Sequence, residues 1–205
     1  MLDLKNQISW LNGSNIDFKF EKKGKNAQIS NSGHTVKNSI FGFSIVLGDL
    51  ELTSGKHYWT YRIDKMTASI VFGVAAGDVN LNNWPNGQDF WGYVVSDGTK
   101  IGKEKDDLSV DKVSVQAETV EGKLAGKKDA SNVANTKNDS AYSSKWEVGD
   151  LVKVVYELVD GIGSLSFYVN GIPVSDAPAF NNILDPVFPA VYLTYADDQV
   201  SIISL

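Results

Sequence analysis

The residues of this chain that could do chemistry are few, and the best spaced of them lie in one loop. In "DVNLNNWPNGQD", Asp78, Asn80 and Asn82 occupy the first, third and fifth positions of a calcium-type loop, and Asp89 the twelfth. The sixth position needs glycine for its sharp turn but is Asn83, and the flanking segments alternate like strands rather than helices. We therefore expect no metal here, because Asn and Asp are also the usual residues of polar turns.

The acids and histidines do not form a catalytic set either. Glycoside hydrolysis needs two carboxyl groups facing each other across the substrate, but Glu157 is the only acid within a strongly apolar strand pattern. Asp64 and Asp160 fall at strand ends. The two histidines are His34, in a turn, and His57, before an aromatic strand, and no GxSxG motif accompanies them. The sequence predicts that the protein is not an enzyme and uses no cofactor.

Composition narrows the class of protein further. The formal net charge of −6 is unsuited to binding phosphate backbones, so we expect no nucleic-acid partner. The absence of cysteine rules out a disulfide framework and thiolate zinc sites. No apolar run approaches the roughly 20 residues that cross a bilayer, and the first residues do not read as a secretory signal. We expect an intracellular, cytoplasmic protein that does not bind membranes.

The sequence predicts mainly β-strands, and these strands would hold any functional side chains in place. Residues 56–64 and 151–160 alternate strictly between apolar and polar side chains, which is typical of antiparallel strands with one buried face. The predicted central strands are 69–77 and 186–195, and shorter strands are predicted at 16–20, 27–30, 40–47, 89–95, 112–119 and 199–204.

The clearest local signal is a hairpin. In "SLSFYVNGIPV", Leu165, Phe167 and Val169 alternate with polar residues up to Asn170-Gly171, a pair that favours a type I′ turn. Helical spacing is limited to Leu4, Ile8 and Leu11, enough for one short N-terminal helix. Residues 103–141 are polar and lack aromatic residues, so we expect an insertion between strands. The fold class is all-β, a sandwich.

Several segments, taken in order, resemble the SPRY domain. They are "SGKHYWTYRID", "SIVFGVAAGDVNLNNW", "DFWGYVVSDGTKIG", "WEVGDLVKVVYELVDGIGSLSFYVNGIPV" and "LDPVFPAVYLTYADDQVSI". The chain departs from the family pattern at Thr60-Tyr61, where a Glu-Val pair is usual, and in the long insertion. The resemblance implies one domain over 1–205, with a lead-in at 1–24, a core at 25–204 and the insertion at 103–141.

The same resemblance implies a bent β-sandwich of two antiparallel sheets that binds proteins through loops at one edge and has no catalytic activity. Three loops then supply the partner-binding residues: 35–43, 81–87 and 194–198. The residues predicted to contact the partner are Lys37, Asn38, Asn82, Asn83, Trp84, Asn86, Tyr195 and Asp197. Trp84 could either be an exposed contact or a lid on the core, and Tyr195 could equally be a contact or framework.

Asp197 and Asp198 would give this face an acidic rim, which favours a basic or amide-rich peptide partner. The expected role is that of an adaptor or scaffold subunit, acting as a monomer on its own or as part of a larger assembly. The alternative is a lectin-like carbohydrate-binding sandwich, because Trp84, Asp78, Asn82 and Asn83 are residue types that sugar sites use.

Overall fold

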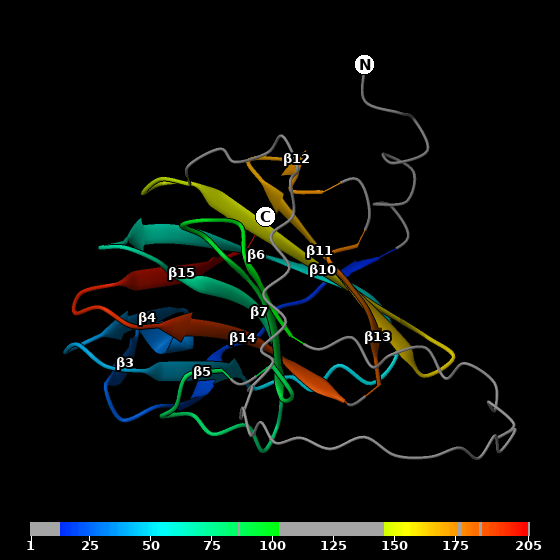
Figure 1. Ribbon diagram of the computed structural model, residues 1–205, viewed down its shortest axis with the longest axis horizontal. Coiled ribbons are helices and arrows are strands. Elements are labelled where there is room, and N and C mark those ends of the chain that lie inside the picture. The colour runs from blue at the N-terminus through cyan, green and yellow to red at the C-terminus, as the bar shows by residue number, and fades with distance from the viewer. Residues whose placement is uncertain (1–12, 86, 103–145, 176–177, 185, 205) are drawn as a thin grey trace, which may run out of the picture.

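The computed structural model describes residues 13–85, 87–102, 146–175, 178–184 and 186–204, and these form two sheets packed face to face (Figure 1). The first sheet has the strand order β12-β11-β10-β6-β15-β4-β3, with β1 added to β6 and β13 added to β11. Its strands are β1 (Ser14–Asn15), β3 (Ala27–Ser30), β4 (Thr35–Asn38), β6 (Gly55–Lys65), β10 (Leu151–Val159), β11 (Ile162–Val169), β12 (Ile172–Pro173), β13 (Phe180–Ile183) and β15 (Gln199–Ile203).

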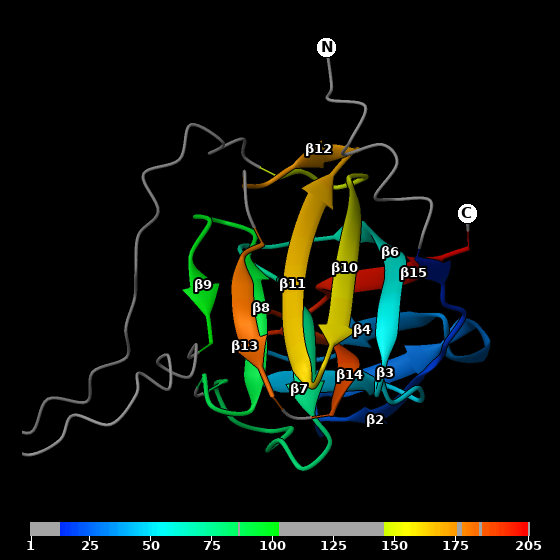
Figure 2. The same ribbon diagram turned by 90° about the vertical axis from the view of Figure 1, so that its right-hand side faces the viewer.

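The second sheet has the order β2-β5-β14-β7-β8-β9. Its strands are β2 (Phe20–Lys23), β5 (Ser44–Gly48), β7 (Val71–Ala76), β8 (Phe90–Val94), β9 (Lys100–Ile101) and β14 (Val187–Leu193). Figure 2 shows β6, β10 and β11 of the first sheet in front of β7, β8 and β14 of the second. Within the described ranges every strand pair is antiparallel except β1 with β6, and the predicted all-β sandwich of two antiparallel sheets is confirmed.

The predicted hairpin is confirmed in register and in turn chemistry. Val169 pairs with Ile172, and both residues between them have positive φ, 49° at Asn170 and 82° at Gly171. This is the backbone that a type I′ turn requires. The Asn170 side chain also fastens the turn to β10, since its Oδ1 accepts a hydrogen bond from the Leu151 N–H at 3.0 Å.

Two of the shorter predicted strands begin later than predicted. Residues 16–19 are not a strand, because the chain leaves the first sheet after β1 and crosses to the second, where β2 begins at Phe20. The strand predicted over 40–47 begins only at Ser44, and the residues before it form an exposed loop. The strand at 112–119, the short N-terminal helix and the insertion at 103–141 lie outside the described residues.

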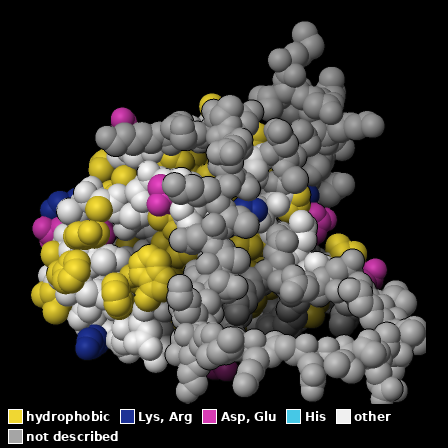
Figure 3. Space-filling model, viewed as in Figure 1, with side chains coloured by type: hydrophobic (Ala, Val, Ile, Leu, Met, Phe, Trp, Pro, Cys, Tyr) yellow, Lys and Arg dark blue, Asp and Glu magenta, His cyan; other side chains and the backbone are white. Residues whose placement is uncertain are grey.

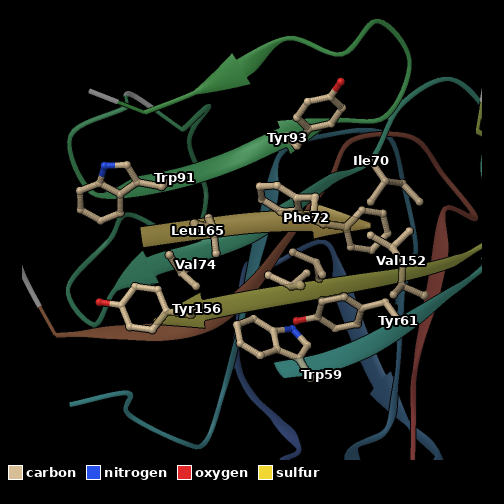
Figure 4. Packing of buried hydrophobic residues seen from close by; sticks show 14 of the residues in the cluster. Trp59, Tyr61, Ile70, Phe72, Val74, Trp91, Tyr93, Val152, Tyr156 and Leu165 are labelled. Carbon is tan, nitrogen blue, oxygen red and sulfur yellow. The ribbon is translucent and has the colours of Figure 1, made fainter. Parts of the chain in front are cut away.

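The core lies between the two sheets and is rich in aromatic rings. Figure 4 shows Tyr61 and Val152 of the first sheet reaching toward Phe72 and Val74 of the second. The Phe72 ring lies 5.2 Å from Tyr61 and 6.3 Å from Trp146, centroid to centroid. The tryptophans predicted to be framework, Trp59, Trp91 and Trp146, are all buried. None of the described helices is long and apolar enough to cross a membrane.

Candidate functional site

Three connections meet at one edge of the sandwich: the β4–β5 loop (39–43), the β7–β8 loop (77–89) and the β14–β15 turn (194–198). In Figure 1 the light-blue β4–β5 loop and the orange-to-red β14–β15 turn protrude at the left edge. Gly42 in the β4–β5 loop donates its N–H to the carbonyl of Thr194 in the β14–β15 turn at 2.8 Å. Ile45, which follows the β4–β5 loop, donates to the carbonyl of Leu81 in the β7–β8 loop at 2.9 Å. Backbone hydrogen bonds therefore hold the three connections together.

This edge exposes large apolar side chains. Phe41 is 69% exposed, Ile40 59%, Trp84 52% and Phe43 40%, and Tyr195 beside them is partly exposed. We call these five residues the aromatic patch. Figure 3 shows hydrophobic side chains gathered at the same edge of the molecule.

Ring contacts organise the aromatic patch into two neighbouring groups. Phe41 meets Tyr195 edge-on, with ring centroids 5.6 Å apart. Phe43 and Trp84 meet at 6.1 Å, and each also contacts the buried ring of Tyr192, at 6.1 Å and 5.2 Å respectively. Burial raises the pKa of Tyr192 to about 12. Trp84 thus combines both sequence interpretations: one part of its ring rests on Tyr192 and the rest faces solvent.

Asn38 and Asp198 support this edge from the inside. Asn38 is fully buried, so the prediction of Asn38 as a surface contact needs correction. Its Nδ2 donates to the carbonyls of Ile40 and Gly42 at 3.0 Å and 2.9 Å, which shapes the β4–β5 loop. The side chain is buried because the loop carbonyls that it binds have turned inward.

Asp198 is also fully buried, which removes it from the predicted acidic rim. Its Oδ1 accepts from the Thr67 N–H at 2.8 Å and its Oδ2 from the Tyr195 N–H at 2.9 Å. Burial raises the pKa of Asp198, and these backbone donors oppose that rise. The carboxylate therefore fixes the turn that carries Tyr195.

Replacing Asp198 by alanine is expected to lower the free energy of unfolding by about 1–3 kcal/mol, because two partly buried backbone N–H groups lose their acceptor. Urea unfolding followed by tryptophan fluorescence measures this loss. Asp97→Ala is the matched control, since exposed Asp97 also accepts a backbone hydrogen bond, from Thr99 at 2.9 Å, and should change stability by less than about 0.5 kcal/mol. Equal stability of the two variants would contradict the supporting role of Asp198.

Asp197 is exposed but already paired with two lysines. Lys37 Nζ lies 2.6 Å from Asp197 Oδ1 and Lys65 Nζ lies 2.8 Å from Oδ2. Hydrogen bonds from Lys37 and Lys65, followed by their charges, lower the pKa of Asp197 to about 2. The prediction of an acidic rim is therefore wrong, because the charge of Asp197 is neutralised by lysines and Asp198 is buried.

The carboxyl carbon resonance of Asp197 is expected to titrate near pH 2. Because the folded-state pKa is depressed, the attraction to Lys37 and Lys65 is present above the ordinary aspartate pKa and disappears as the pH falls through about 2. In a Lys37→Ala, Lys65→Ala variant the midpoint should return toward about 3.9. An unchanged midpoint in that variant would show that the lysines do not hold the carboxylate.

The remaining predicted contacts lie in the β7–β8 loop. Asn82 and Asn83 are exposed beside Trp84, and Asn86 lies outside the described residues. Asn82 Oδ1 accepts from the Lys25 N–H at 2.8 Å, which ties this loop to the turn before β3. The Asn82 carbonyl oxygen therefore has a structural role in the loop.

The residues predicted to contact the partner omit three members of the patch, Ile40, Phe41 and Phe43. The sequence places them both in the predicted partner-binding loop 35–43 and at the start of the strand predicted over 40–47. A signal was present in Gly42, whose φ of 144° is strained for other residues and which interrupts the strand pattern.

The described residues contain little that resembles a catalytic centre. Ser14 Oγ lies 3.1 Å from His57 Nδ1, but the other ring nitrogen, Nε2, lies 2.6 Å from the carbonyl oxygen of Ser54 rather than from a carboxylate. Glu157 pairs with Lys56 at 3.5 Å. Across the described part of the chain, no group of three or more His, Cys, Asp or Glu is placed to hold a metal ion.

The fold and its loop-built edge define a class of β-sandwich domains that present a loop surface on a rigid frame. The SPRY domain model matches residues 56–204, and the chain belongs to the SPRY domain family. SPRY domains are generally non-catalytic interaction domains that bind protein partners. Comparison with curated proteins by sequence returns no match.

Solved structures resemble the chain over nearly its whole length. The crystal structure of the SPRY domain of human HERC1 matches with a TM-score of 0.62 and 20% identity, covering 92% of this chain and 98% of that one. The TRIM65 PSpry domain matches with a TM-score of 0.57 and 14% identity, covering 100% and 97%. A further human SPRY domain gives 0.57 and 14%, covering 90% and 100%. At these identities the likeness concerns the fold.

Proposed function

We propose that this chain binds a partner protein or peptide on the aromatic patch, as an adaptor or scaffold subunit of a larger assembly. The single observation that carries the proposal is the exposure of Ile40, Phe41, Phe43 and Trp84 together at one edge. Contiguous exposed apolar surface is unfavourable in water and commonly marks an interaction site. A few residues carry most of the binding energy at protein interfaces, and Trp and Tyr are enriched among them.

The frame beneath the patch supports a rigid binding surface. The loop carrying Phe41 is held by the Asn38 side chain and by the bond from Gly42 to Thr194, and Trp84 rests on Tyr192. Loops ordered in this way lose little conformational freedom when a partner docks, so more of the contact energy appears as affinity. This agrees with the general division between a packed scaffold and functional loops.

Carbohydrate binding has less support. A sugar site would need the amide and carboxylate groups around Trp84 to be available for hydroxyl groups. Asn82 Oδ1 is bound to the Lys25 N–H, and Asn80 Oδ1 is bound to the Asn82 N–H at 3.1 Å. These amides build the loop, so nothing specific favours the lectin alternative.

We extend the proposal to the whole chain as one domain. Strands β3, β4 and β5 precede the residues matched by the family model, yet they pair within both sheets, which favours a single unit. The cytoplasmic location and the monomeric state outside an assembly remain predictions from the sequence.

A random-peptide library displayed on phage tests the proposal directly. Selection against the full chain, followed by counter-selection against a Phe41→Ala, Trp84→Ala variant, should enrich peptides that carry aliphatic or aromatic anchors and bind only the unmodified chain. Enriched peptides that bind both proteins equally would contradict the proposed site. Failure to enrich any peptide would contradict peptide binding by this surface.

A further inference from the structure

Lysines lie beside the aromatic patch. Lys37 and Lys65 lie beside the β14–β15 turn, where both contact Asp197. Lys25 is exposed and its backbone is bonded to Asn82, two residues before Trp84. Figure 3 shows lysine or arginine side chains on two sides of the hydrophobic group at this edge.

The two lysines at the β14–β15 turn carry one more charge than the acid that they share. Asp197 can balance only one of the two lysines that hold it, and the neighbouring Asp198 is buried under the turn. Lys37 and Lys65 keep 41% and 58% of their side chains exposed, so both can still meet a partner. Lys25 adds a third positive charge on the side of Trp84.

We infer that the partner segment carries an aliphatic or aromatic anchor flanked by aspartate or glutamate. The inference rests on the proposed function and assigns its ligand class. The anchor would cover the exposed rings, while the flanking carboxylates would approach the lysine rim. Complementary rim charges speed association and reject partners of the wrong sign. A basic partner, which the sequence favoured, would meet like charges here.

Asp197 then acts as an internal competitor for the partner's carboxylates. It occupies the same two ammonium groups that an incoming acid would contact. Removing its charge should therefore improve binding, although the substitution deletes an interaction of the folded protein. An increase in affinity would distinguish this inference from a purely structural role of Asp197. If Asp197 only held the turn in shape, removing its charge would lower the affinity.

The test uses a peptide obtained from the phage selection, synthesised with its flanks changed to acidic, amide or basic residues. Fluorescence polarisation with the full chain should rank the acidic version tightest and the basic version weakest. Lys37→Ala and Lys65→Ala should each weaken the acidic version about 2- to 5-fold, and Asp197→Asn should tighten it by a similar factor. Raising the salt from about 0.05 M to about 0.5 M should weaken the acidic version much more than the amide version.

Lys19→Ala is the control. Lys19 is exposed like the rim lysines but lies against Gly33, at the opposite end of β4 from Lys37. It should leave affinity unchanged. Equal affinity of the three flank variants, or weaker binding by Asp197→Asn, would overturn the inference. If binding still depends on Phe41 and Trp84 in that case, the proposed function stands; if it does not, the proposed function fails as well.

Discussion

Replacing Phe41 and Trp84 together by alanine is expected to weaken peptide binding by at least about 100-fold while the protein stays folded. Aromatic anchors at interfaces contribute about 2 kcal/mol or more each, which is about 30-fold in affinity. The two rings lie in different contacts, Phe41 on Tyr195 and Trp84 on Tyr192, so their losses should be nearly additive. Fluorescence polarisation with a labelled selected peptide measures the change.

A matched double variant shows whether weaker peptide binding results from loss of the aromatic patch or from loss of exposed apolar surface in general. Val159 and Ile162 are 56% and 50% exposed and pair across the β10–β11 hairpin, away from the three connections. Val159→Ala, Ile162→Ala should therefore bind the peptide like the unmodified chain. Circular dichroism melts of both double variants check that each is folded. A folded Phe41→Ala, Trp84→Ala variant with full affinity would exclude the aromatic patch as the binding surface.

Replacing Phe72 by alanine is expected to cause the largest loss of stability, about 3–5 kcal/mol. The side chain is fully buried between the sheets and contacts Tyr61 and Trp146. Its removal loses apolar burial and leaves a cavity that the surrounding rings cannot readily fill. Because a domain is stabilised by only about 5–15 kcal/mol in total, this loss should be visible in urea unfolding.

Two further variants show whether the loss of stability in Phe72→Ala comes from the loss of buried side-chain volume. Phe72→Leu keeps much of the apolar volume and should cost clearly less than alanine. Ile172→Ala removes a side chain that is 59% exposed and should change stability by less than about 0.5 kcal/mol. If Phe72→Ala were no more destabilising than Ile172→Ala, the packing described for the core would be wrong.

Much of the framework could be predicted from the sequence because its signals are local. The strand over 151–160 alternates in the sequence, and Val152, Val154 and Tyr156 are buried in β10 while the residues between them are only partly buried. The turn at Asn170-Gly171 follows from residues that tolerate positive φ. Such features are determined by residues that are close in the sequence and do not depend on contacts with distant segments.

The candidate site was harder to predict because its features depend on contacts between distant segments. Asp197 meets Lys65 across 132 positions of sequence, so its neutralised charge could not be read from its neighbours. Asp198, the next residue, is buried because the N–H groups of Thr67 and Tyr195 need an acceptor. Phe41 is exposed although its residue type favours burial, because the β4–β5 loop turns outward before β5 begins.

Mapping of a selected peptide by NMR tests the central claim most directly. Amide spectra of the full chain are recorded while the peptide is added to saturation. We predict that the largest shift changes fall on residues 40–43, on the indole N–H of Trp84 and on Tyr195, with little change in the β10–β11 hairpin. Largest changes at Val159, Ile162 or Ile172, with the aromatic patch unaffected at saturation, would contradict the claim that this edge is the partner-binding surface.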